Sequence, residues 1–311
     1  MEKVYTSLGL MSGTSMDGID ASIIKSDGEN KYETVFDQYF RYDEVIYREL
    51  VNIRNKVNSL EDLEINSRIV SQLEREITLF HATVCNKIIN DYHSNIDLIG
   101  FHGQTIFHNA NKKISKQLGD ANLLSSLLKK KVVYNFRKND LINGGQGAPL
   151  APIYHQLLVN QNQINLPACI INIGGIANIT IISSKDSNDL KSYDIGPGNC
   201  LLDEWIRKNN KGRFDKNGEL AKVGITDEII LNQAIDNFDS IKNNNLSFDV
   251  KDFDLNFVRG LSLEDGLSTL TDFTASLIHQ SIVAQINFEK DKELNVLICG
   301  GGRKNLSLVN S

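Results

Sequence analysis

The sequence predicts an α/β protein made of two similarly organised halves with a cleft between them. Strand patterns alternate with helical patterns along the chain, which favours sheets covered on both faces. Each half opens with two strand patterns joined by a glycine-rich turn and then passes through helices to a further strand. The chain has 311 residues. This is more than one hydrophobic core usually supports, so two domains are expected.

The first half begins with strands. Its apolar runs predict strands over residues 4–11, 19–25, 32–41, 96–101 and 132–134. Between residues 43 and 91 the apolar positions follow a helical spacing, with Val70, Leu73 and Ile77 as examples, and one or two helices are expected there. Residues 118–128 predict another helix, with Asp120 near its start.

The second half repeats this scheme. Strands are expected over residues 168–173, 176–182, 192–195 and 294–299. Leu201, Leu202 and Trp205 belong to the apolar stripe of a helix. A later helix is expected to start after Ser262, which is a suitable N-cap because acidic residues follow in the first turn.

Composition excludes several classes of protein. The net charge is −6, so neither nucleic acid nor an anionic membrane is an expected partner. The four cysteines (Cys85, Cys169, Cys200 and Cys299) are far apart and form no Cys-x-x-Cys pair, which argues against structural zinc and against a disulfide framework. The N-terminus lacks the pattern of a signal peptide, and no apolar run reaches membrane-spanning length, so a cytoplasmic location is expected.

The first glycine-rich turn lies in residues 9–20, with the sequence GLMSGTSMDGID. Glycine and hydroxyl residues between two strands allow backbone N–H groups to converge on an anion. A carboxylate such as Asp17 repels phosphate, so its presence indicates a divalent cation between the two. An ordinary Ser/Gly hairpin turn is the alternative, and the pattern alone does not separate the two interpretations.

Two further glycine-rich segments follow predicted strands. Gly174 and Gly175 join two strands in the second half, where the duplication would place a second phosphate-binding turn; a routine Gly-Gly hairpin is the alternative. Residues 300–302 are three glycines after a buried strand, which permits a flat base or ribose to pack against the backbone. The chain contains neither the glycine fingerprint of a dinucleotide fold nor a P-loop.

Six strings carry a resemblance to a known family. They are GLMSGTSMDG at 9–18, FHGQTI at 101–106, NGGQGAP at 143–149, NIGG at 172–175, DIGPGN at 194–199 and GGG at 300–302. With them the chain resembles the actin, hexokinase and heat-shock ATPase superfamily, and within it the anhydro-N-acetylmuramic acid kinase family, over nearly its whole length. The superfamily usually has Asp at the end of the first strand, where this chain has Met11 and Ser12; that is typical of the narrower family.

The resemblance implies a fold, a reaction and a set of ligands. The fold would be two actin-like ATPase (ribonuclease H-like) domains, residues 1–140 and 141–311, with an interdomain cleft. The enzyme would use ATP and Mg²⁺ to open the 1,6-anhydro ring of anhydro-N-acetylmuramic acid with water and to phosphorylate O6. The product, N-acetylmuramic acid 6-phosphate, lies on the peptidoglycan recycling route. A homodimer is also implied.

The resemblance also assigns the nucleotide site. The implied ATP-binding residues are Gly13, Thr14, Ser15, Met16, Asp17, Gly18, Ile19, Asp20, Gly174, Gly175, Asn178, Gly300, Gly301 and Gly302. Asp17 and Asp194 are the candidates for ordering the magnesium. Capping of the following helix is the alternative for Asp194, although Asn199 could fill that role instead.

The reaction needs a general base for the attacking water. Asp140 is the candidate, because it lies between the strand that ends near Tyr134 and the glycine-rich loop 143–149, and because the family motif places the base there. A surface carboxylate paired with Arg137 or Lys138 is the alternative. Asp120 is better explained as a helix N-cap.

Sugar contacts are expected from His102, Gln104, Arg137 and Gln146. The first two follow the end of a predicted strand, where side chains can reach a ligand. His108 lies near enough in sequence for a metal site. A lone cleft histidine or a satisfied core histidine is favoured, since no carboxylate has a matching spacing.

The chain departs from the family near its end. The family normally continues after the glycine triplet with a helix, a strand and a further helix that includes a Glu-bearing segment, and this sequence stops at residue 311. Reduced stability and weak or lost catalysis are therefore expected. Two alternatives follow: a kinase of another aminosugar on the same fold, or a catalytically impaired nucleotide-binding module.

Overall fold

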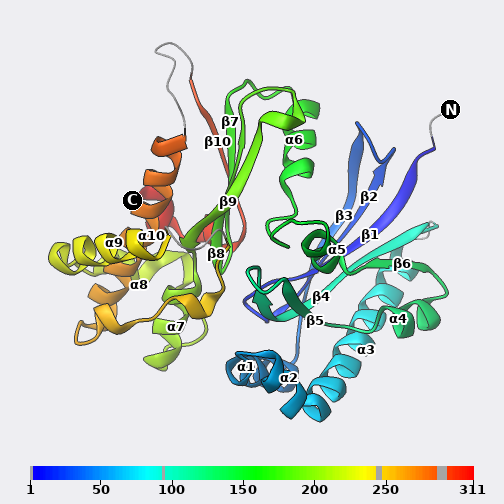
Figure 1. Cartoon of the computed structure of the whole chain (residues 1–311), viewed down its shortest axis with the longest axis horizontal. Helices are drawn as coiled ribbons and strands as arrows, with labels where there is room; N and C mark the ends of the chain where they lie inside the picture. Colours follow the sequence, from blue (N-terminus) through cyan, green and yellow to red (C-terminus); the bar gives the residue numbers. More distant parts are fainter. Residues whose placement is uncertain (1–2, 93–94, 243–246, 286–292) are drawn as a thin grey trace. The chain divides into compact units, whose positions relative to one another are not determined.

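The chain forms two compact units, Met1–Leu150 and Ala151–Ser311 (Figure 1). The computed structural model describes residues 3–92, 95–242, 247–285 and 293–311. The expected division after Asp140 would cut through helix α5 (Phe136–Ile142), whereas the units separate after Leu150. The later boundary has a local cause: the loop after α5 bonds back to it, since Gly145 N donates to Asp140 O at 2.9 Å.

The first unit contains both strands and helices, which follow one another along the chain. They are β1 (Tyr5–Ser12), β2 (Gly18–Ser26), β3 (Tyr32–Arg41), α1 (Glu44–Lys56), α2 (Leu60–Ile65), α3 (Ser67–Tyr92), β4 (Leu98–Asn109), β5 (Ile114–Leu118), α4 (Ala121–Leu128), β6 (Lys131–Tyr134) and α5 (Phe136–Ile142).

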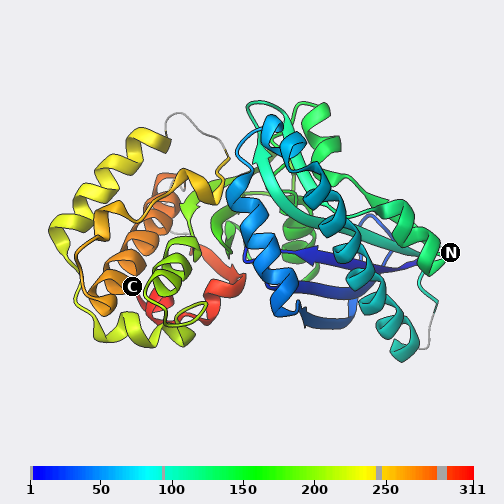
Figure 2. The ribbon, with the colours of Figure 1, turned by 90° about the horizontal axis from the view of Figure 1, so that it is seen from below.

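The described strands of the first unit form one six-stranded sheet. Its order is β3-β2-β1-β4-β5, and β6 pairs with β4. β1, β2 and β3 form an antiparallel meander, while β4 is parallel to β1 and β6 is parallel to β4. Helices α1 to α4 lie on one side of this sheet (Figures 1 and 2). The core between them includes Leu8, Ile19, Ile77 and Ile99, each 0% exposed.

The second unit contains helices, short 3₁₀ turns and four strands among its described residues. They are α6 (Pro152–Gln161), β7 (Ala168–Ile173), β8 (Ile176–Ile182), η1 (Ser187–Asp189), β9 (Leu190–Pro197), α7 (Cys200–Lys208), η2 (Lys216–Gly218), α8 (Glu219–Val223), α9 (Glu228–Lys242), η3 (Val250–Asp252), η4 (Asn256–Val258), α10 (Leu263–Gln285), β10 (Asn295–Cys299), η5 (Gly301–Lys304) and α11 (Leu306–Asn310).

The second sheet repeats the first. Its order is β9-β8-β7-β10; the β7–β8 and β8–β9 pairs are antiparallel, and β10 is parallel to β7. This reproduces the order β3-β2-β1-β4 and its strand directions. The α/β fold with a duplicated arrangement, predicted from the strand patterns, is therefore confirmed.

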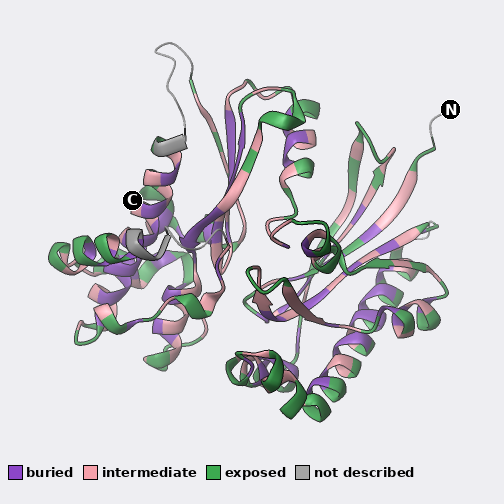
Figure 3. Ribbon diagram, viewed as in Figure 1, coloured by how far each residue is buried: buried purple, intermediate pink, exposed green. Residues whose placement is uncertain are grey.

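The two sheets differ in how far they are covered. In the second unit α7 and α10 lie on one side of the sheet, and α6 packs on the other side against β8 and β9. As a result β7 and β8 are buried along most of their length, whereas β3 and β6 in the first unit are largely exposed or half-buried (Figure 3).

Several local expectations are confirmed. Asp120 is the N-cap of α4 and accepts from Leu123 N at 2.9 Å. Ser262 Oγ accepts from Asp265 N at 3.0 Å at the start of α10. Other expectations were wrong in extent: three helices rather than one or two fill residues 44–92, and residue 118 ends a strand instead of starting a helix. Among the described residues, no helix is both long and apolar enough to cross a membrane.

Candidate active site

The turn between β1 and β2 contains most of the predicted phosphate-binding residues. Met16 adopts a left-handed conformation with φ of 59°, and its side chain is 1% exposed. Met16 N donates to Gly13 O at 3.2 Å, which closes the turn. Thr14 and Ser15 are exposed at its tip. The buried thioether therefore fixes the turn to the core while its hydroxyl residues face solvent.

Three carbonyl oxygens of this turn accept hydrogen bonds from the body of the unit. Gln104 Nε2 donates to Gly13 O at 2.8 Å, and Arg54 Nη1 donates to Thr14 O at 2.9 Å. The backbone N–H of Tyr42 donates to Asp17 O at 2.8 Å. Carbonyl oxygens repel anions. Engaging them elsewhere is therefore the arrangement that an anion-binding turn requires.

Gln104 was expected to contact the sugar. Its side chain is 0% exposed, and its amide nitrogen donates to the Gly13 carbonyl from inside the unit. Gln104 therefore supports the turn, and its contact with the sugar stays a prediction. Sequence spacing could not indicate this, because the two residues are 91 positions apart.

The acidic residues of the turn occupy distinct environments. Asp17 is half-buried and accepts a short hydrogen bond from Ser15 Oγ. Burial raises the pKa of the Tyr39 hydroxyl, and the neighbouring carboxylates of Asp17 and Asp20 raise it further. Asp20 is exposed on β2, whereas Ile19 is 0% exposed and belongs to the core. Asp17 is the carboxylate best placed to act together with the turn.

The second cluster of the first unit surrounds Asp140 on α5. Its Oδ2 accepts from Gly147 N at 2.7 Å, and Arg137 Nη1 donates to Gly147 O at 2.9 Å. Arg137 Nε also donates to His102 Nε2 at 2.8 Å. Burial and the adjacent guanidinium lower the pKa of His102 to about 4, so the imidazole is neutral and can accept from Arg137. Asp140 and Arg137 thus bind the backbone N–H and the backbone C=O of the same residue, Gly147.

A close approach fixes the direction of the Asp140 carboxylate. A Cβ atom at Gly145 would lie 2.0 Å from Asp140 Oδ2, so a larger residue there would push the carboxylate out of its present position. Gln146 is half-buried in the loop between Gly145 and Gly147. The predicted base and loop 143–149 are therefore parts of one hydrogen-bonded structure.

The second unit brings its predicted residues together around the turn at Gly174 and Gly175. Gly198 N and Cys200 N donate to Gly175 O at 2.9 and 3.2 Å, and Asn199 N donates to Gly174 O at 2.8 Å. A Cβ atom at Gly198 would lie 2.4 Å from Gly174 O. The start of α7 therefore packs directly against this turn.

The glycine triplet lies against the same turn. A Cβ atom at Gly300 would lie 2.6 Å from Ile173 O, and one at Gly302 would lie 2.3 Å from the Ile173 side chain. Gly301 has open space around it. Asn178 is half-buried in β8, opposite Asp194 on β9.

Asp194 does not cap the helix that follows it. It is 7% exposed, and its Oδ2 accepts from Ser247 Oγ at 3.2 Å and from Phe248 N at 3.0 Å. Asn199 is the N-cap residue of α7, but its side-chain amide donates to Ile173 O and Gly174 O instead of capping the helix. Both capping alternatives were therefore wrong, because these side chains serve tertiary contacts.

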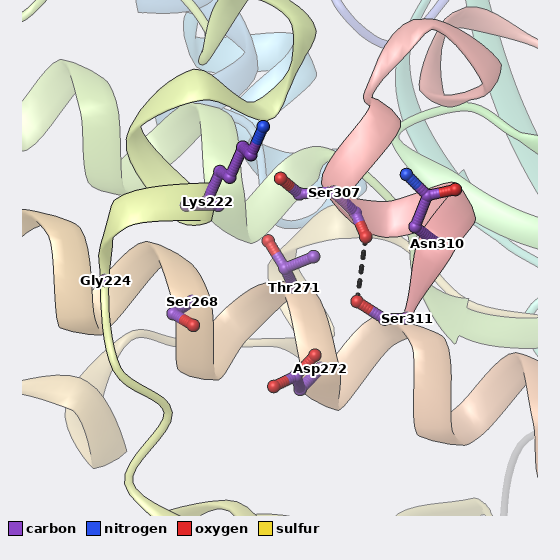
Figure 4. Close-up of a pocket in the computed structure, with 9 residues that line it drawn as sticks. Lys222, Gly224, Ser268, Thr271, Asp272, Ser307, Asn310 and Ser311 are labelled. Atoms are coloured by element: carbon purple, nitrogen blue, oxygen red, sulfur yellow. Dashed lines mark hydrogen bonds between the residues drawn. The ribbon is translucent and has the colours of Figure 1, made fainter.

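A cavity of about 220 Å³ lies in the second unit among α8, α10 and α11 (Figure 4). Its lining residues are Ala221, Lys222, Gly224, Ser268, Thr271, Asp272, Ser307, Asn310 and Ser311. None of the predicted site residues lines it. Within the described part of the chain, no group of three or more His, Cys, Asp or Glu residues is arranged to hold a metal ion.

The fold and the turns together define a class of protein. A three-stranded meander followed by a parallel fourth strand, present twice and each time with glycine at the first hairpin, is the arrangement of the actin-like ATPases. Within that class the chain belongs to the anhydro-N-acetylmuramic acid kinase family, whose model matches residues 5–311.

Individual relatives agree with this assignment. An anhydro-N-acetylmuramic acid kinase from Pelagibacter ubique (strain HTCC1062) is 65% identical over 312 residues, a match that covers 100% of this chain and 83% of the relative. An anhydro-N-acetylmuramic acid kinase from Rhizobium etli is 34% identical, in a match that covers 99% of this chain and 83% of the relative. Among solved structures, glucokinase from Balamuthia mandrillaris in complex with glucose aligns over 99% of this chain and 82% of its own, with a TM-score of 0.35 and 13% identity.

Proposed function

We propose that this chain uses ATP to convert 1,6-anhydro-N-acetylmuramic acid into N-acetylmuramic acid 6-phosphate. The observation that carries the proposal is the family match over residues 5–311. The reaction joins two steps: water adds to the anomeric carbon as its bond to O6 breaks, and O6 then takes the phosphoryl group. The chain must therefore supply a base for the water and a binding site for phosphate.

Asp140 is the proposed base. One oxygen of its carboxylate accepts from Gly147 N, and the glycine at position 145 packs against it, so the carboxylate has a fixed direction. In this proposal the other oxygen takes the proton from water. Gln146 is proposed to contact the sugar. Arg137 and His102 bind one another and the loop, and are proposed to shape the sugar site from that position.

The residues of the β1–β2 turn fit a magnesium nucleotide. The turn presents exposed hydroxyl residues, its carbonyls are engaged, and Asp17 offers a hard oxygen ligand. Mg²⁺ is usually held by one or two carboxylates together with water and substrate phosphates, so one carboxylate suffices. When bound, MgATP supplies the phosphoryl group and a cation that offsets the charge of its phosphates. Asp194 is proposed as a second carboxylate that helps to order the magnesium, although its Oδ2 already accepts two hydrogen bonds.

In the second unit, the turn at Gly174 and Gly175 and the glycine triplet are proposed to take part in nucleotide binding. The open space around Gly301 supports this role, since a base or ribose can approach the backbone there. We also propose that the protein is a cytoplasmic homodimer that binds no nucleic acid. Light scattering of the purified protein tests the dimer.

Mass spectrometry of the product, after incubation with MgATP and the anhydro sugar in ¹⁸O-water, tests the reaction. The expected product carries one phosphate and one ¹⁸O atom. Asp140→Asn keeps the size of the side chain but removes the base. It should abolish turnover while MgATP binding is retained. Asp120→Asn is the matched control, because asparagine caps a helix as well as aspartate does. Turnover retained in Asp140→Asn would reject Asp140 as the base.

A further inference from the structure

Three polar side chains are buried at the end of β1, and the proposed chemistry uses none of them. Ser12, Tyr42 and His81 are 1%, 2% and 0% exposed. Ser12 Oγ lies 3.0 Å from Tyr42 Oη and 3.4 Å from His81 Nε2. Burying polar groups costs free energy unless they are hydrogen-bonded, so this cluster requires an explanation.

The direction of each hydrogen bond in the cluster can be assigned. His81 Nδ1 lies 2.8 Å from Ile77 O, and because a carbonyl only accepts, Nδ1 carries the proton. Burial lowers the pKa of His81 to about 4, so the ring is neutral and Nε2 is an acceptor. Ser12 Oγ–H therefore donates to His81, and Tyr42 Oη–H donates to Ser12. A chain of hydrogen bonds that all run in one direction is mutually strengthening.

Tyr42 contacts the β1–β2 turn at both ends. Its hydroxyl reaches Ser12, which immediately precedes Gly13, and its backbone N–H donates to Asp17 O at 2.8 Å. The ring itself is held by an edge contact with Phe80, at 5.0 Å between centroids. One residue thus joins the beginning and the end of the turn.

The histidine is held in the same manner. Phe101 on β4 meets the His81 ring edge-on, also at 5.0 Å between centroids. Because α3 carries His81 and β4 carries Phe101, two elements far from the turn in sequence fix the position of Ser12.

We propose that Tyr42, together with His81 and Ser12, is a positioning device that keeps the two ends of the β1–β2 turn at a fixed separation for phosphate binding. The inference rests on the proposed function of the turn. A turn that is ordered before the ligand arrives does not lose conformational entropy on binding. Removing the Tyr42 hydroxyl breaks the link between Tyr42 and the Ser12 end of the turn, while the link to Asp17 O remains.

The test compares Tyr42→Phe with Thr78→Val. Thr78 is also buried in α3, where its hydroxyl donates to Glu74 O and accepts from Asp120 N, away from the turn. Tyr42→Phe is expected to raise the KM for MgATP roughly tenfold, with the KM for the anhydro sugar unchanged. Thr78→Val is expected to lower the melting temperature with neither KM altered. Ser12→Ala should reproduce the Tyr42→Phe result by removing the shared partner.

Calorimetry of MgATP binding without sugar separates the two proposals. If the wild-type chain binds MgATP but converts no sugar, the proposed function fails, and the Kd values of Tyr42→Phe and Thr78→Val still decide the role of Tyr42. An unchanged Kd in Tyr42→Phe would overturn the inference. So would equal losses in the two variants, because that pattern indicates general destabilisation. A wild-type chain that binds no MgATP would overturn both.

Discussion

The two glycine-bearing turns occupy equivalent positions in the repeated strand order, but they are held by different means. The carbonyls of the β1–β2 turn accept from the side chains of Gln104 and Arg54, which are 91 and 40 residues away from their partners. The β7–β8 turn accepts mainly from backbone N–H groups at the start of α7. The same topology therefore acquires its rigidity from side chains in one unit and from main chain in the other.

Because of this difference, the two turns should respond to different kinds of substitution. Long side chains from distant elements can be substituted without a direct clash, but their loss releases the turn. Main-chain contacts survive side-chain substitutions but do not tolerate an additional atom between the strands and the helix. Three predictions follow from the comparison, in order of decreasing effect.

The largest effect is expected from Gly198→Ala. The added Cβ would lie 2.4 Å from Gly174 O and 3.2 Å from Ala177 N, so the backbone must move. We expect the free energy of unfolding to fall by about 3 kcal/mol. Gly13→Ala is the matched control, because the nearest atom to its added Cβ is Ser15 Oγ at 3.7 Å. Urea unfolding measures both, and equal stability of the two variants would contradict the comparison.

Acid should destabilise the first unit more than the second. The pKa of both His81 and His102 is lowered to about 4, so the unfolded chain binds more protons below its ordinary histidine pKa of about 6.5. The stabilisation is complete above that value and is lost as pH falls towards 4. Because each pKa unit corresponds to about 1.4 kcal/mol, the loss amounts to a few kcal/mol.

The second unit offers a separate probe for this measurement. Trp205 is the single tryptophan of the chain and is 8% exposed in α7. Between pH 6.5 and 4.5, circular dichroism should report a loss of stability before Trp205 fluorescence does. If circular dichroism and Trp205 fluorescence instead change over the same pH range, the two units lose stability together, and the first unit is not the more sensitive to acid.

The smallest effect is expected from the side-chain amides that bind the two turns, Gln104 in the first unit and Asn199 in the second. Gln104→Leu removes the only side-chain donor found for Gly13 O among the described residues, and we expect roughly tenfold weaker MgATP binding. Asn199→Ala removes two amide contacts, but the backbone donors to the β7–β8 turn remain. We therefore expect MgATP binding to weaken less than threefold. Calorimetry measures the Kd for MgATP of both variants. A larger loss of affinity in Asn199→Ala than in Gln104→Leu would contradict the proposed difference between the two turns.

Features that depend on residues close together in the sequence could be predicted. Strand patterns, the glycine turns and the caps at Asp120 and Ser262 are local features, and the structure contains them. Helices α5 and α6 were missed because short helices have few apolar repeats. The roles of Tyr42 and Arg54 were also missed, since a contact across 30 or 40 residues leaves no periodic signal.

The identities of the site residues could be proposed, but not their partners. The family resemblance indicated Asp140 and Arg137, yet nothing in the spacing indicated that both bind the backbone of Gly147. Gln104 was assigned to the ligand because the predicted strand ended at Phe101, whereas β4 continues to Asn109 and contains Gln104. Its burial depends on how β4 is aligned with β1, which only the assembled sheet determines.

The contact between Gly145 and Asp140 has an evolutionary consequence. Since a Cβ atom at position 145 would fall 2.0 Å from Asp140 Oδ2, a side chain there requires the Asp140 carboxylate to turn away from its present position. A descendant that acquired a side chain at position 145 would therefore lose the present direction of the proposed base. Positions 140 and 145 are therefore expected to vary together or to stay fixed together.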